Sequence, residues 1–134
     1  MEATAKRNRA FVEGLYARYV AGDLDAVLGS LAEDAVWESE GSALPWSGRH
    51  IGQGARDYFA ALAAACELRG FTVERVLADE EWVVVLCTVQ LYLRAAGREA
   101  TFRKVDTLRI EGDRILAFRE YYDSGRLREA LGAP

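Results

Sequence analysis

Residues 98–122 read REATFRKVDTLRIEGDRILAFREYY. Apolar and polar residues alternate on both sides of Gly112-Asp113, which is typical of two half-buried antiparallel strands joined by a tight turn. The set that we expect to face inward contains Ala100, Phe102, Lys104, Asp106, Leu108 and Ile110 on the first strand, and Leu116, Phe118, Glu120 and Tyr122 on the second. Two carboxylic acids, Asp106 and Glu120, therefore fall among residues that should line a core.

A buried carboxylate is strongly destabilising unless it is neutralised, paired or used in chemistry. If the apolar faces of the two strands match, Asp106 and Glu120 are direct cross-strand neighbours with Cβ atoms about 5 Å apart. That register requires an odd-length turn or a β-bulge near Gly112-Asp113, because a plain two-residue turn points Glu120 to the opposite face. Two carboxyl groups this close do not both ionise freely, so one keeps its proton near neutral pH. Such a pair suits proton transfer.

Lys104 lies one inward position from Asp106. Desolvation by Phe102 and Leu108 raises the pKa of Asp106, whereas the Lys104 ammonium lowers it, and the balance depends on whether the lysine snorkels outward. A purely structural interpretation stays open. In it, Asp106 accepts hydrogen bonds from Lys104 or Tyr16, and Glu120 forms an ion pair at the mouth of a pocket.

The remaining sequence predicts helices followed by an antiparallel sheet, which is an α+β pattern. Apolar residues at helical spacing predict helices over residues 4–21, 24–31 and 52–69, with a last helical turn from residue 123 or 124 to 131. Alternating segments predict strands over residues 35–40, 71–78, 82–94, 98–111 and 114–122, and residues 41–48 read as a loop. The 134 residues fit a single domain, residues 1–134.

Composition argues against several classes of partner. The net charge is −4 and the cations are scattered, so we expect no nucleic acid partner. No apolar run approaches the roughly 20 residues that span a bilayer, so we expect no membrane association. Cys66 and Cys87 lie in apolar segments without Cys-x-x-Cys spacing, which indicates reduced core cysteines and a cytoplasmic protein. His50 is the only histidine, and we expect it at the surface or rim, with neither a metal nor a cofactor.

Five segments together resemble the NTF2-like superfamily and, within it, the SnoaL-like group related to ketosteroid isomerase. They are Tyr19–Asp25 (YVAGDLD), Leu31–Trp37 (LAEDAVW), Ser47–Arg49 (SGR), Val105–Ile110 (VDTLRI) and Arg119–Asp123 (REYYD). The resemblance implies a cone-shaped α+β fold, in which a curved antiparallel sheet packs on three helices and encloses a deep apolar pocket. It also implies frequent homodimers through the outer sheet face, and the segment Trp82–Val89, apolar on both faces, agrees with that expectation.

The resemblance also assigns expectations to single residues. Asp106 matches the position of a protonated aspartic acid in ketosteroid isomerase, and Glu120 matches an acidic residue that takes part in proton transfer in limonene epoxide hydrolases and in a phenazine-pathway branch. Ser39 stands where the isomerase has its general base, and Leu15, one residue before Tyr16, stands at its oxyanion tyrosine. The central strand carries no charge between Leu86 and Tyr92, where the epoxide hydrolases have an arginine and an aspartate.

Aromatic residues complete the expected pocket. We expect Trp37 to border it, Trp46 to cover its mouth, and the tyrosines to direct hydroxyl groups inward; core packing is the alternative for each. The expected ligand-binding residues are Trp37, Ser39, Trp46, Tyr58, Phe102, Lys104, Leu108, Phe118 and Tyr122.

These observations favour a small cofactor-free enzyme that transfers protons in an apolar, cyclic carbonyl compound, as an isomerase, a polyketide cyclase-like enzyme or a dehydratase. Glu120 is the expected base and Asp106 the acid or oxyanion donor, with help from Tyr16 or Tyr122. A non-catalytic ligand-binding or dimerising module is the alternative. An epoxide hydrolase-like enzyme has less support, because the charges it needs are missing.

Overall fold

The computed structural model describes residues 2–41 and 44–132. Its helices are α1 (Glu2–Val20), α2 (Leu24–Gly29), α3 (Ala55–Ala65) and α4 (Ser124–Ala130), and a 3₁₀ turn, η1 (Gly52–Gly54), precedes α3. Its strands are β1 (Leu31–Ser39), β2 (Gly48–Ile51), β3 (Cys66–Ala78), β4 (Trp82–Leu93), β5 (Arg98–Glu111) and β6 (Arg114–Tyr121).

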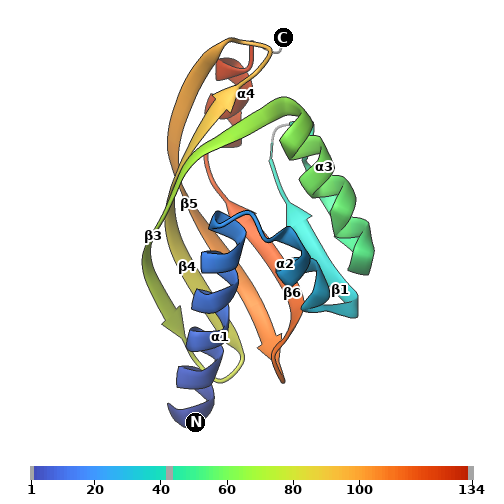
Figure 1. The fold of residues 1–134 in the computed structure, drawn as a ribbon, viewed down its shortest axis with the longest axis vertical. Helices are drawn as coiled ribbons and strands as arrows, with labels where there is room; N and C mark the ends of the chain where they lie inside the picture. Colours follow the sequence, from blue (N-terminus) through green and yellow to red (C-terminus); the bar gives the residue numbers. More distant parts are fainter. Residues whose placement is uncertain (1, 42–43, 133–134) are drawn as a thin grey trace.

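The strands form one curved sheet in the order β2-β1-β6-β5-β4-β3 within the described residues. Neighbours are antiparallel except β1 and β6, which are parallel. Figure 1 shows α1, α2 and α3 on the same side of this sheet, so their apolar faces and the inner sheet face enclose the core. The expected α+β fold with a curved sheet packed on three helices is therefore confirmed.

Pairing between strands arranges the inward side chains in tiers. Glu120 pairs with Asp106 on one side and with Ser39 on the other, and we call these three residues the acid tier. One inward position further along, Phe118 pairs with Leu108 and Trp37, and this set is the floor. Floor residues are at most 5% exposed.

A β-bulge gives Glu120 its inward direction. Gly112 and Asp113 form a two-residue turn with φ of 56° and 59°, which suits the tight hairpin turn with two left-handed residues. Ile115 pairs with Ile110, but Arg109 pairs with Ala117, so Leu116 is the extra residue. The cross-strand pairing of Asp106 with Glu120, conditional on a bulge, is confirmed. The inward position predicted for Leu116 is wrong, because the bulge places Ile115 in the core instead.

Three predicted boundaries need correction. The helix predicted over residues 52–69 ends at Ala65, and Cys66 to Arg69 extend β3 because they pair with the end of β4. Strand β1 begins at Leu31 rather than at Ala35. Leu31 therefore belongs to this strand and not to the helix predicted over residues 24–31. The loop predicted over residues 41–48 ends in an unpredicted short strand, β2; residues 42 and 43 lie outside the described part of the chain.

Cys66 and Cys87 are both free and buried, as expected. The described helices include none with the length and hydropathy to cross a membrane. A cytoplasmic location stays a prediction.

Gly52 fixes the approach of α3 to β1. Its φ is +53°, and a Cβ there would lie 2.3 Å from the Glu33 carbonyl oxygen. Gly52→Ala should lower the free energy of unfolding by about 2 kcal/mol or more, because the backbone must shift. Gly14→Ala is the matched control: nothing lies within 4 Å of a Cβ there, and a helical alanine should stabilise by about 0.5–1 kcal/mol. Urea unfolding of both variants measures the difference; equal effects would contradict this role for Gly52.

Candidate active site

The inner face of the sheet and the helices α1, α2 and α3 enclose a mostly apolar pocket. Its walls are formed by Leu15, Tyr16, Tyr19, Val27, Trp37, Trp46, Tyr58, Phe59, Leu62, Leu68, Phe71, Val89, Leu91, Phe102, Lys104, Asp106, Leu108, Ile115, Phe118, Glu120 and Tyr122. Leu68 is 39% exposed, so the pocket meets solvent near the start of β3. The remaining space is about 70 Å³, less than the roughly 150 Å³ that holds a benzene molecule. A ring-sized ligand therefore requires wall side chains to shift.

Lys104 connects the two acids. Its Nζ lies 3.2 Å from Asp106 Oδ1 and 3.0 Å from Glu120 Oε1, with the lysine side chain only 10% exposed. Burial lowers the pKa of Lys104, but the two carboxyl groups outweigh this and hold the pKa above its ordinary value. The ammonium also lies 5.4 Å from the Phe71 ring and 5.8 Å from the Phe118 ring. Lys104 is thus a charged, inward-pointing residue that does not snorkel to solvent.

Glu120 accepts hydrogen bonds from three side chains. Ser39 Oγ and Tyr58 OH donate to Oε2 at 2.5 and 2.9 Å, and Lys104 Nζ donates to Oε1 at 3.0 Å. All three partners of Glu120 are donors. An ionised carboxylate only accepts hydrogen bonds, whereas a protonated carboxyl group would also have to donate one, so these partners suit the ionised form. Glu120 itself is 3% exposed. A buried carboxylate is thereby held in a fixed position facing the pocket.

Asp106 has the opposite character. Tyr16 OH donates to its Oδ2 at 2.5 Å, and Oδ1 has only the Lys104 ion pair and no hydrogen bond. Burial raises the pKa of Asp106 above its ordinary value; the Lys104 ammonium opposes this and the neighbouring Glu120 charge adds to it. The acid tier therefore pairs a carboxylate with a carboxyl group that retains its proton more readily.

The tyrosines around the acids stay neutral donors. Burial raises the pKa of both Tyr16 and Tyr58 well above that of free tyrosine, and the negative charge of the carboxyl group that each one contacts adds to the effect. Their hydroxyl groups come from α1 and α3, on the helical side of the pocket, and reach the two acids on the sheet side. Helix packing thus fixes the orientation of both acids.

Trp46 and Tyr122 extend this network toward the loop before β2. Trp46 Nε1 donates to Tyr122 OH at 2.8 Å, and Tyr122 OH lies 3.4 Å from Ser39 Oγ. Tyr122 also packs against Phe102 with ring centroids 5.4 Å apart. Trp46 is 2% exposed and forms part of the pocket wall; that it covers the mouth stays a prediction.

All site residues predicted from the sequence line the pocket except Ser39. Ser39 still belongs to the site, because its hydroxyl donates to Glu120. Tyr16, expected to assist the reaction or to donate to Asp106, does donate to Asp106 Oδ2. Sequence reasoning missed ten wall residues, among them Tyr19 and Phe71. Helical spacing from Tyr16 was a usable signal for Tyr19, whereas Phe71 depended on the pairing of β3 with β4.

His50 is half-buried on β2 beside the Tyr58 ring, with centroids 6.4 Å apart, and it is not among the pocket walls. Among the described residues, no three His, Cys, Asp or Glu side chains are grouped as metal ligands would be.

Comparison with known proteins agrees with this geometry. A sequence model described as a SnoaL-like domain matches residues 12–118. No sequence among curated proteins matches significantly. An NTF2-like protein of unknown function from Burkholderia pseudomallei K96243 is similar, with 25% identity over 94% of this chain and 98% of that one and a TM-score of 0.85.

Two less similar structures share the fold. An NTF2-like protein from Burkholderia thailandensis E264 is 17% identical over 92% of this chain and 95% of that one, with a TM-score of 0.83. An epoxide hydrolase of the LEH-like kind from M. tuberculosis is 21% identical over 95% of this chain and 90% of that one, with a TM-score of 0.71.

The raised pKa of Asp106 has a consequence for stability. Between the unfolded and folded pKa values, the native state holds a proton that the unfolded chain has lost, so stability falls as pH rises through this window. Asp106→Asn lacks that dependence. Its free energy of unfolding relative to the wild type should therefore rise as pH increases from about 4 toward neutrality. Urea unfolding across this range measures the difference, and a difference independent of pH would contradict the assignment.

Proposed function

The chain belongs to the SnoaL-like domain family, and from its pocket we propose that it is a cofactor-free enzyme that transfers protons next to a carbonyl group. The observation that carries this proposal is the acid tier: Glu120 accepts three hydrogen bonds, while its cross-strand neighbour Asp106 is buried beside it with one oxygen, Oδ1, that has the Lys104 ammonium at 3.2 Å as its partner. A base and an acid thus lie side by side in an apolar space. Isomerisation, cyclisation and dehydration all use that chemistry.

In the proposed reaction, the Glu120 carboxylate removes a proton from the carbon next to the substrate carbonyl. The electron pair of the C–H bond moves into the carbonyl group and gives an enolate oxygen. Asp106 donates a hydrogen bond from Oδ1 to that oxygen, because Oδ2 is occupied by Tyr16. Glu120 then returns the proton to another carbon in an isomerisation. Tyr16, Tyr58 and Ser39 are positioning residues that hold the two acids in place.

Charge balance supports a neutral substrate. The acid role proposed for Asp106 requires its protonated form, and in that form the Lys104 ammonium and the Glu120 carboxylate sum to zero inside the pocket. A charged ligand would leave one buried charge without a partner, which is strongly unfavourable. As the reaction proceeds, negative charge moves from Glu120 to the substrate oxygen. The Lys104 ammonium lies beside both acids and therefore stays close to that charge. The aromatic walls favour a mostly apolar, cyclic compound.

Epoxide hydrolysis by the known arrangement has less support. The pocket walls within the described residues include Lys104 as their one cation and no arginine, and the central part of β4 is uncharged.

Deuterium exchange tests the proposal directly. Cyclohexanone in D2O, followed by proton NMR, should lose its α-protons faster with the wild-type protein than without it. Glu120→Gln should lower the enzymatic rate about 100-fold or more because the base is lost. Asp106→Asn should lower it by about 100- to 1000-fold because the oxyanion donor is changed. Rapid exchange in both variants would contradict the roles assigned here.

Glu38→Gln is the matched control, since Glu38 pairs with Arg119 outside the pocket at 3.0 Å; its exchange rate should equal that of the wild type. If the ketone binds to the wild type and no protein accelerates exchange, the chain is a non-catalytic ligand-binding module instead.

We also propose a homodimer through the outer sheet face. Trp82 and Tyr121 are 40% and 44% exposed there, and Val84 and Leu86 alternate with the inward residues of β4. Exposed and half-buried apolar residues on one face of a sheet favour an interface there. Light scattering should give the mass of a dimer for the wild type and of a monomer for Val84→Glu, because a buried charge disrupts the contact. The control is Arg56→Glu, on the exposed face of α3. The same mass for all three proteins would contradict the proposed face.

A further inference from the structure

The Trp37 indole is buried, and the described residues offer it no hydrogen-bond acceptor. Trp37 is 4% exposed, and Nε1 has no hydrogen-bond partner in residues 2–41 and 44–132. The ring stacks on Phe118 with centroids 3.8 Å apart and an interplanar angle of 12°, so it is held firmly in one orientation. Tyr58 and Phe59 are its other aromatic neighbours, at 5.7 and 5.2 Å between centroids. A buried N–H group without an acceptor is unusual and destabilising.

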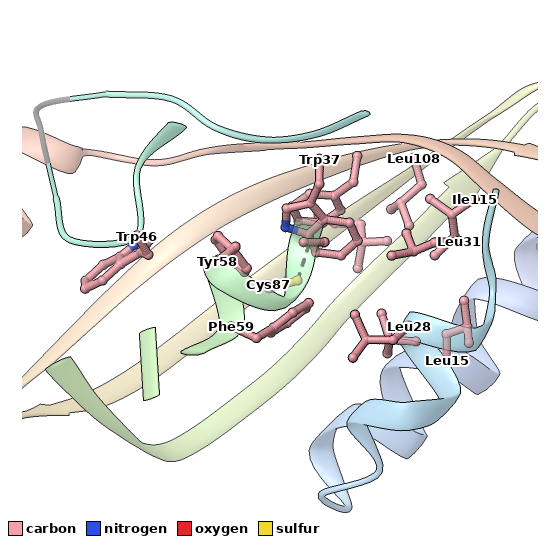
Figure 2. Packing of buried hydrophobic residues seen from close by; sticks show 14 of the residues in the cluster. Leu15, Leu28, Leu31, Trp37, Trp46, Tyr58, Phe59, Cys87, Leu108 and Ile115 are labelled. Carbon is pink, nitrogen blue, oxygen red and sulfur yellow. Dashed lines mark hydrogen bonds between the residues drawn. The ribbon is translucent and has the colours of Figure 1, made fainter. Parts of the chain in front are cut away.

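This donor belongs to the floor of the pocket. Trp37 is a wall residue of the cavity, and Figure 2 shows its indole nitrogen on the edge of the ring that faces the Tyr58 side. The floor lies two residues along the strands from the acid tier, which corresponds to about 7 Å. A molecule that extends past Asp106 and Glu120 therefore has Trp37 at its inner end. Because Nε1 is itself fully buried, contact with it requires the same shift of wall side chains that a ring-sized ligand needs.

The other two indoles differ from Trp37. Trp46 Nε1 already donates to Tyr122 OH at 2.8 Å, and Trp82 is 40% exposed and not among the pocket walls. Among the fully buried polar atoms of the pocket walls, Trp37 Nε1 and Asp106 Oδ1 lack a hydrogen bond within the described residues. Asp106 Oδ1 has the Lys104 ion pair at 3.2 Å, so Trp37 Nε1 is the buried wall donor that has neither a hydrogen bond nor an ion pair there.

We propose that Trp37 is a specificity-determining residue, whose indole N–H binds an oxygen acceptor on the inner end of the ligand. The inference rests on the proposed function and narrows its substrate class to neutral cyclic compounds with two oxygen functions. One oxygen lies at the acid tier, where the reaction takes place, and the second lies at the floor. A six-membered ring with oxygen atoms on opposite carbons has a length comparable to the separation of the two tiers.

Titration with cyclohexane-1,4-dione and cyclohexanone tests this inference, because the two ketones differ mainly in the second oxygen. In ¹⁵N–¹H spectra of the wild type, the dione should move the Trp37 indole resonance downfield, whereas cyclohexanone should not. The Trp82 resonance should be unaffected by either. The dione should also bind about five- to tenfold more tightly. Trp37→Phe, which retains an aromatic ring on Phe118, should remove that preference.

The Trp46→Phe and Trp82→Phe variants assign the Trp37 resonance by elimination, so the spectral test stands even if Trp37→Phe fails to fold. Equal responses of Trp37 to both ketones, or a preference for the dione that persists in a folded Trp37→Phe variant, would overturn the inference and leave the proton-transfer proposal intact. Absence of any pocket response to either ketone would overturn the proposed ligand class, and this inference with it.

Discussion

The buried ammonium of Lys104 is the interaction on which the site depends. It lies within ion-pair distance of two carboxyl groups on adjacent strands, and all three side chains are withdrawn from solvent. Burying an ammonium and two carboxyl groups would be prohibitive without close contact and additional donors. Tyr16, Tyr58 and Ser39 supply those donors from α1, α3 and β1. The polar centre therefore links helices and sheet and holds the acids in one geometry.

The hairpin pattern was sufficient to predict most of the sheet and the meeting of Asp106 with Glu120. Alternation gives the face of each strand, and the apolar faces must coincide, so the need for a bulge follows from the residues alone. The position of that bulge does not follow from the residues alone. Ile115 and Leu116 are both large and apolar, and only the pairing of Ile115 with Ile110 selects which one enters the core. Asp23 and Asp123 cap α2 and α4, because their side chains accept from the Ala26 and Arg126 backbone amides.

Other features depended on contacts between distant segments. The alanine-rich end of α3 has no local stop signal before Gly70, and the helix ends at Ala65 because Cys66 pairs with Leu93. Lys104 was expected near Asp106, but its contact with Glu120 requires the β5–β6 register. Ser39 was predicted on the correct face of its strand, but it is not a pocket wall. Its hydroxyl donates to Glu120 instead, because the parallel β1–β6 pair brings the two side chains together. Such contacts have no local signature in the chain.

Strand order also constrains how the molecule is assembled. β6 comes after the other five strands in the chain, yet it lies between β1 and β5 and joins the two parts of the sheet. During synthesis on the ribosome, β1 can pair only with β2, while β3, β4 and β5 form their own meander. Closing the parallel β1–β6 contact brings together segments about eighty residues apart, a step that is intrinsically slow. The nascent chain thus exposes an unpaired edge on each part until its C-terminal strand emerges, which is a period of vulnerability to aggregation.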